Sequence, residues 1–156
     1  MSGAIERFSE AARALGIEPD VHRFPAGTKT AGDAAAAIGC DVAQIVKSLV
    51  FVADEAPILA FTSGANRVDL DRLAGLAGAT IVRRATPEEA RLATGFAVGG
   101  TPPFGHPIRL RAWVDPVLLE FDRVWAAAGT PDAVFPITPG DLLRCTGAAE
   151  ADFAER

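Results

Sequence analysis

Lys47 is the residue of this chain whose type and surroundings most strongly suggest a chemical role. It lies within the most apolar run of the sequence, Gln44-Ile-Val-Lys-Ser-Leu-Val-Phe-Val52, and it is one of only two lysines beside thirteen arginines. Burying an unpaired ammonium costs several kcal/mol, which is comparable to the net stability of a whole domain. Lys47 therefore either extends to water along its aliphatic stem or faces a pocket where an anionic or carbonyl group of a ligand meets it.

A second segment with chemical potential is the loop Gly99-Gly-Thr-Pro-Pro-Phe-Gly-His106, which lies between two expected strands. Adjacent glycines let backbone N–H groups approach a ligand closely, and the two prolines stiffen the loop. Rigid N–H donors suit the stabilisation of a developing oxyanion, because they need no reorganisation during a reaction. The same composition is typical of an ordinary turn, so the loop by itself does not predict an active site.

Three further residues are candidates for binding. His106 adjoins the glycine–proline loop and is interpreted either as a functional residue or as a histidine at the rim of a pocket. Asn66 and Arg67 follow a glycine turn, where they would contact a phosphate or simply face solvent.

The sequence predicts neither a metal nor a cofactor. Cys40 and Cys145 lie far apart and share no metal-ligand spacing with His22 or His106. The phosphate-binding pattern GxxxxGK[ST], a GxGxxG segment after a strand, HExxH and GxSxG are all absent.

The composition predicts one globular domain spanning residues 1–156. Hydrophobic residues make up 49% and charged residues 22% of the chain, which argues against disorder. The net charge of −5 argues against a protein that coats DNA or RNA by neutralising phosphates, although a few cations suffice to grip one end of an RNA. The apolar runs are too short to span a membrane and no signal peptide is evident, so we expect a cytoplasmic protein with reduced cysteines.

Hydrophobic periodicity and capping signals predict helices and short strands without a regular βαβ alternation. Helices are expected to begin near Ile5, Thr30, Asp41, Asp69, Thr86 and Thr138. Strands are expected at His22–Phe24, Ser48–Val52, Ile58–Thr62, Thr80–Arg84, Phe96–Val98, Ile108–Val114 and Ala133–Ile137, whereas Arg123–Ala128 fits either state. The pattern favours an α+β fold with a mixed, largely antiparallel sheet, curled into a partial barrel and flanked by helices.

Five segments occur in a characteristic order, namely Thr30-Ala-Gly-Asp-Ala-Ala-Ala-Ala-Ile-Gly39, Gln44-Ile-Val-Lys-Ser-Leu49, Asp69-Leu-Asp-Arg-Leu73, Thr94-Gly-Phe-Ala-Val-Gly-Gly-Thr-Pro-Pro-Phe-Gly105 and Gly140-Asp-Leu142. Together they resemble the YbaK/EbsC family, which includes the editing domain inserted in bacterial prolyl-tRNA synthetases and its free-standing relatives. The resemblance covers residues 4–147. Its implied fold, a mixed α+β arrangement around a curled sheet, agrees with the interpretation from periodicity.

The resemblance implies an aminoacyl-tRNA deacylase that removes a wrong small amino acid from tRNA, usually the tRNA for proline, without a metal. Lys47 matches the family's key lysine, and Gly99 to Pro103 match its G-x-x-x-P loop. We hypothesise that Lys47 orients the terminal adenosine through a phosphate or carbonyl oxygen. The backbone amides expected to hold the substrate carbonyl are those of Gly99, Gly100 and Thr101. Further substrate-binding positions are expected at Thr30, Asn66, Arg67, Pro102, Pro103, Gly105 and His106.

The amino acid removed and the partners stay open at the level of sequence. Family members that act on cysteine carry polar side chains where this chain has Phe24 and Val134, which favours alanine, serine or threonine. The expected partners are the acceptor end of aminoacyl-tRNA and prolyl-tRNA synthetase. Two other classes fit the same residues, a non-catalytic module that docks on a synthetase or on a tRNA end, and a hydrolase of free aminoacyl esters or nucleotides.

Overall fold

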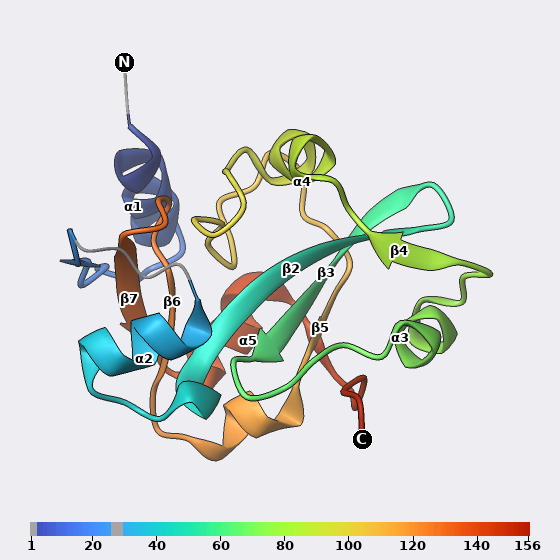
Figure 1. Cartoon of the computed structure of the whole chain (residues 1–156). Coiled ribbons are helices and arrows are strands. Elements are labelled where there is room, and N and C mark those ends of the chain that lie inside the picture. Colours follow the sequence, from blue (N-terminus) through green and yellow to red (C-terminus); the bar gives the residue numbers. More distant parts are fainter. Residues whose placement is uncertain (1–2, 26–29) are drawn as a thin grey trace.

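A computed structural model describes residues 3–25 and 30–156 of the chain. Its centre is a hairpin of two long strands, β2 (Ile45–Ala53) and β3 (Ala56–Ser63), which cross the middle of the molecule (Figure 1). The two strands pair antiparallel from Val46↔Ser63 to Ala53↔Ala56. This confirms the strands predicted at Ser48–Val52 and Ile58–Thr62, which extend further at both ends in the structure.

The sheet around this hairpin is mixed and open. Its strand order is β1-β7-β6-β2-β3-β5-β8, and β4 pairs separately with β2. The pairs β1–β7, β2–β3, β2–β4 and β6–β7 are antiparallel, whereas β2–β6, β3–β5 and β5–β8 are parallel. The α+β class and the mixed sheet are therefore confirmed, while the sheet does not close into a barrel. The shorter strands are β1 (His22–Arg23), β4 (Val82–Arg84), β5 (Ala112–Val114), β6 (Val124–Ala127), β7 (Ala133–Ile137) and β8 (Ala149–Glu150).

The helices begin where their capping signals predict. Thr30, Asp69, Thr86 and Thr138 each accept a hydrogen bond from a backbone N–H of the first turn, which satisfies a donor that a helix start would otherwise leave free. The elements are α1 (Ala4–Ala14), α2 (Ala31–Ile38), α3 (Leu70–Ala77), α4 (Pro87–Thr94) and α5 (Pro139–Thr146), with short 3-10 helices η1 (Val42–Gln44) and η2 (Pro116–Glu120). No helix among the described residues is long and apolar enough to cross a bilayer.

Two segments differ from the strand predictions, and a third, which the sequence left open between helix and strand, forms a strand. Phe96–Val98 forms no strand, because Thr94 accepts the Phe96 N–H through its hydroxyl and the next residues turn back on themselves. The predicted strand Ile108–Val114 is reduced to β5, and Ile108 itself is 71% exposed. The ambiguous segment Arg123–Ala128 forms β6, because its backbone pairs with both β2 and β7.

The core lies on both faces of the sheet. The main cluster packs α1 and α5 against one face through residues such as Phe8, Phe135 and Leu142. In a second cluster, Leu73 of α3 packs against the hairpin. A third, smaller cluster joins the alanines of α2 to Trp125 and neighbouring side chains. In Figure 1, α2 lies beside the start of β2, and α4 lies beside its other end near β4.

The turn after β3 is packed so closely that only glycine fits at position 64. A Cβ on Gly64 would lie 2.5 Å from the carbonyl oxygen of Val42 and 2.8 Å from the Cβ of Ala31. We expect Gly64→Ala to lower the free energy of unfolding by about 2 kcal/mol, which is typical of overpacking. Gly75 on α3 has no atom within 4 Å of its Cβ position, so Gly75→Ala should raise that free energy by about 0.5–1 kcal/mol. Urea unfolding measures both, and equal effects would contradict the close packing of the turn.

Candidate active site

Lys47 lies on the wall of a cavity of about 420 Å³. The cavity opens where the sheet has a gap, because β2 pairs with β6 only at Ile45 and Val46 and with β4 only from Phe51 to Ala53. Between these pairings no described strand covers the outer edge of β2. The volume falls within the range of roughly 300–1,000 Å³ that is common for small-molecule sites. The other walls come from α2, β4, α4, β6, β7 and the glycine–proline loop.

The ammonium of Lys47 is half-buried and is held by one backbone carbonyl. Its Nζ donates a hydrogen bond of 2.6 Å to the carbonyl oxygen of Asn66. Burial lowers the pKa of Lys47, the positive charges of Arg84 and Arg67 lower it further, and the negative charge of Asp115 opposes them. An ammonium has three N–H donors, so two stay available to a ligand.

The structure brings part of the glycine–proline loop to the same cavity. Gly99 and Thr101 line the cavity together with Lys47, as the sequence predicts. Within the described part of the chain, the backbone N–H groups of Gly99 and Thr101 have no hydrogen-bond partner. Free donors therefore lie on the wall of a cavity that also holds a cation, which is the arrangement expected of an oxyanion site.

Gly100, by contrast, has a structural position. Its N–H donates to the carbonyl oxygen of Ala97 at 3.0 Å, and its own carbonyl accepts from the N–H of Gly129 at 3.0 Å. A Cβ at this position would lie 2.7 Å from the Cα of Thr130. The amide of Gly100 is thus not free to bind a substrate carbonyl, contrary to the sequence-based expectation.

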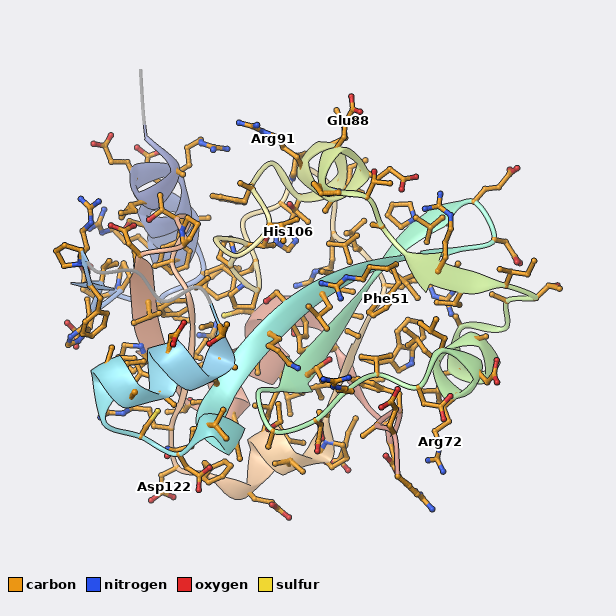
Figure 2. All side chains as sticks on the ribbon, in the orientation of Figure 1. Phe51, Arg72, Glu88, Arg91, His106 and Asp122 are labelled. Carbon is orange, nitrogen blue, oxygen red and sulfur yellow. The ribbon has the colours of Figure 1, made fainter. Side chains whose placement is uncertain are left out.

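The second half of the loop lies at a different cavity, of about 160 Å³. Pro103, Gly105 and His106 line this second cavity and not the one that contains Lys47, whereas Pro102 lines neither. His106 is hydrogen-bonded through Nε2 to the carbonyl oxygen of Pro102 at 2.8 Å, and burial lowers the pKa of its imidazole. Figure 2 shows His106 in the loop below α4, whose Glu88 and Arg91 point away from the sheet. The structure therefore does not bring these loop residues to Lys47.

The remaining predicted residues take different positions around the cavity. Thr30 lines it and caps α2 through a 3.0 Å hydrogen bond from the N–H of Asp33. Asn66 does not line the cavity, and both its carbonyl and its side-chain amide are used in internal hydrogen bonds. Arg67 is exposed and acts on Lys47 through its charge.

Comparisons with known proteins agree on one family. A family model described as "Aminoacyl-tRNA editing domain" matches residues 25–145. The chain belongs to the aminoacyl-tRNA editing domain family. A solved structure described as a candidate trans-editing enzyme for prolyl tRNA synthetase is 47% identical, with a TM-score of 0.94 over 100% of this chain and 99% of the other. A hypothetical protein of known structure is 30% identical, with a TM-score of 0.88 over 96% of this chain and 100% of the other.

The curated relatives include one protein that the match covers for most of its length and much longer ligases. The uncharacterised protein YwhH of Bacillus subtilis is 30% identical over 80% of each chain. Proline–tRNA ligase of Nitratidesulfovibrio vulgaris is 35% identical over 100 residues, which is 64% of this chain but only 17% of the ligase. The editing domain therefore corresponds to a small part of that synthetase. Membership of the family makes the chain an aminoacyl-tRNA deacylase.

Sequence reasoning missed four residues of this editing domain that the structure places at or next to the cavity, namely Ser48, Arg84, Asp115 and Trp125. Asp115 precedes a proline at the start of η2, and this pattern is typical of a residue that caps a helix. The pattern does not predict the hydrogen bonds of Asp115 to Ser63 and Asn66. The described residues contain no group of three or more His, Cys, Asp or Glu side chains placed to share a metal ion.

Ser48 lines the cavity with a buried hydroxyl that has no hydrogen-bond partner among the described residues. An unsatisfied buried hydroxyl costs about 1–3 kcal/mol, so we expect Ser48→Ala to raise the free energy of unfolding by about 1 kcal/mol. Ser63 is the matched control, because its hydroxyl donates to the carbonyl oxygen of Ala43 at 2.8 Å. Ser63→Ala should lower the same quantity by about 1 kcal/mol. Chemical denaturation tests the pair, and an equal loss in both variants would show that the Ser48 hydroxyl is satisfied in solution.

Proposed function

We propose that this editing domain hydrolyses, in trans, the ester that joins a mischarged small amino acid to the tRNA for proline. The observation that carries the proposal is the presence of the Lys47 ammonium and of free backbone amides at Gly99 and Thr101 on the walls of one cavity. The similarity to a segment of proline–tRNA ligases and to a candidate trans-editing enzyme supports the choice of tRNA.

An aminoacyl ester is already activated, so the chain must mainly position it and stabilise negative charge on the carbonyl oxygen. The amides of Gly99 and Thr101 are the donors for that oxygen. Lys47 keeps the adenosine end of the substrate in place through a phosphate or carbonyl oxygen. The carbonyl of Gly100 accepts a hydrogen bond from the N–H of Gly129, and Gly100 packs closely against Thr130. These contacts hold the loop in place, so its free donors are preorganised.

The proton needed for hydrolysis comes from the attacking water. Water adds to the ester carbon, the bond to the ribose oxygen breaks, and that oxygen leaves with a proton. Among the described residues that line the cavity there is no histidine, carboxylate or cysteine. Lys47 as an ammonium is not a base, and, as the resemblance to the family implies, we assign the proton transfer to the neighbouring ribose hydroxyl of the substrate itself.

The amino-acid end fits a small side chain. Ala34, Trp125 and Val134 line the cavity near α2 and form a largely apolar wall. We therefore favour alanine, serine or threonine over cysteine. An apolar wall separates side chains that differ by one methylene by only about 1–3 kcal/mol, so we expect broad activity on small amino acids.

The direct test is a panel of tRNA for proline charged with alanine, serine, threonine, cysteine or proline. We expect release of the small amino acids and a loss of about 10²- to 10³-fold in Lys47→Ala, similar to the removal of one stabilising donor. Lys47→Arg should also fail, because a planar guanidinium does not replace a compact ammonium. Arg91→Gln, which removes an exposed cation on α4, should keep the wild-type rate.

Two outcomes of this panel contradict the proposal. Binding of charged tRNA without release of the amino acid favours a non-catalytic module. Equal rates on free aminoacyl esters and on charged tRNA favour a small-molecule hydrolase. Wild-type activity in Lys47→Ala would remove the assigned role of the lysine even if the tRNA substrate were correct.

Arg84 lines the cavity and Arg67 is exposed, and both act on Lys47 through their positive charge. Neither arginine has a carboxylate within ion-pair distance among the described residues, and Arg84 lies over the ring of Phe51 at 5.7 Å. Burial lowers the pKa of Lys47, and the repulsion from these two arginines lowers it further, with only the Asp115 carboxylate acting in the opposite direction. Phosphates of the tRNA 3′ end would relieve that repulsion.

We expect Arg84→Gln to raise the KM for charged tRNA with little change in kcat. The slope of log(kcat/KM) against log[salt] should fall in magnitude by about 1, because one phosphate contact is lost. Arg83→Gln is the matched control, since Arg83 is already paired with Glu89 at 2.7 Å and does not line the cavity. Steady-state kinetics over a range of salt concentrations measure both variants, and identical slopes would contradict a phosphate contact at Arg84.

A further inference from the structure

Asp115 is a buried carboxylate that has no cationic partner among the described residues. It is only 3% exposed, and no ion pair involves it. One oxygen, Oδ1, accepts from the N–H of Val117 at 3.0 Å and caps η2. The other, Oδ2, accepts from the N–H of Ser63 at 3.1 Å and from Nδ2 of Asn66 at 2.8 Å.

The contacts of Oδ2 go beyond what a helix cap requires. Asp69, which caps α3, accepts from two N–H groups of its own helix and remains partly exposed. Asp115 instead reaches the turn between β3 and α3, about fifty residues earlier in the chain. Burying a carboxylate is costly unless hydrogen bonds compensate the lost hydration. The contacts of Asp115 with residues far away in the sequence therefore need an explanation other than helix capping.

The turn that Asp115 holds is the one that anchors Lys47. The side-chain amide of Asn66 donates to Asp115, and the backbone carbonyl of the same residue accepts from Nζ of Lys47 at 2.6 Å. The same turn is closely packed at Gly64, where an added Cβ would lie against Val42 and Ala31. Two hydrogen bonds through one residue therefore connect a buried negative charge to the ammonium at the cavity.

We propose that Asp115 is a positioning residue for Lys47, which fixes the turn so that the Asn66 carbonyl holds the ammonium at the cavity wall. This proposal adds a positioning residue to the proposed function. Only its expected effect on catalysis rests on that function. The position of the ammonium itself does not depend on which substrate is hydrolysed.

The charges that face Lys47 come from three elements. Arg84 lies at the end of β4, Arg67 lies after the turn that follows β3, and Asp115 lies before η2. The two arginines lower the pKa of Lys47 in addition to burial, whereas Asp115 raises it. Removing the charge of Asp115 therefore lowers that pKa further. If the ammonium is the active form, activity is lost as pH rises through this pKa, and the loss must move to lower pH.

The composition of the chain makes Lys47 directly observable. The sequence contains only Lys29 and Lys47, so lysine labelled with ¹³C and ¹⁵N in its side chain gives two sets of NMR signals. Lys29→Arg leaves the signals of Lys47 alone and assigns them. A pH titration of these signals reports the ionisation of Lys47 without any substrate.

We expect Asp115→Asn to move the titration midpoint of Lys47 to lower pH, the direction expected when a nearby opposite charge is lost. With charged tRNA, kcat should fall about 10-fold with little change in KM, and more at high pH than at low pH. Asp69→Asn is the matched control, because it neutralises a capping carboxylate that does not contact the turn. In Asp69→Asn, the titration midpoint of Lys47 should equal that of the wild type.

A second variant keeps the test decisive if Asp115→Asn fails to fold. Asn66→Ala retains the backbone carbonyl but removes the amide that links it to Asp115, so the Lys47 signals should shift in the folded protein. Unchanged signals and midpoint in both folded variants, or in Asn66→Ala alone, would overturn the positioning role. A shifted titration with no activity on any charged tRNA would instead leave the inference standing and contradict the proposed function.

Discussion

The hydrogen bond between the Lys47 ammonium and the Asn66 carbonyl is the contact on which the site depends. A half-buried cation is stable only where its surroundings supply an acceptor, and here one carbonyl at 2.6 Å supplies it. Because that carbonyl uses one of three N–H donors, the ammonium is held in place and still able to bind. Asp115 acts by fixing the turn that carries this carbonyl, and the cavity walls surround the remaining donors.

The cavity itself follows from the topology of the sheet. β2 is the longest strand, and its two short neighbours on one edge, β6 and β4, cover only its ends. The gap between them exposes the middle of the strand, where Lys47 lies, to a ligand and not to another strand. Small residues of α2 and the rigid loop at Gly99 form the walls. A cavity at a break in a sheet thus needs no special element, only strands of unequal length.

Much of this arrangement could be predicted from the sequence, and the limits have physical causes. The caps at Thr30, Asp69 and Thr86 are local signals, so the helix starts were predicted correctly. The shared cavity of Lys47 and Gly99 was predicted through an ordered resemblance to a family. The position of Gly100 differs from the expectation and the contacts of Asp115 were not predicted, because both depend on residues that lie far away in the sequence. The residues around either position contain no pattern that predicts these long-range contacts.

The most direct measurement is a crystal structure with a non-hydrolysable analogue of the charged 3′ end, in which an amide replaces the ester between the amino acid and adenosine. The account predicts that the acyl carbonyl oxygen lies within hydrogen-bond distance of the Gly99 or Thr101 N–H. It also predicts that Nζ of Lys47 contacts a phosphate or carbonyl oxygen of the analogue while keeping its bond to Asn66. An analogue bound at the second cavity beside His106, or one that leaves Lys47 without a contact, would contradict it.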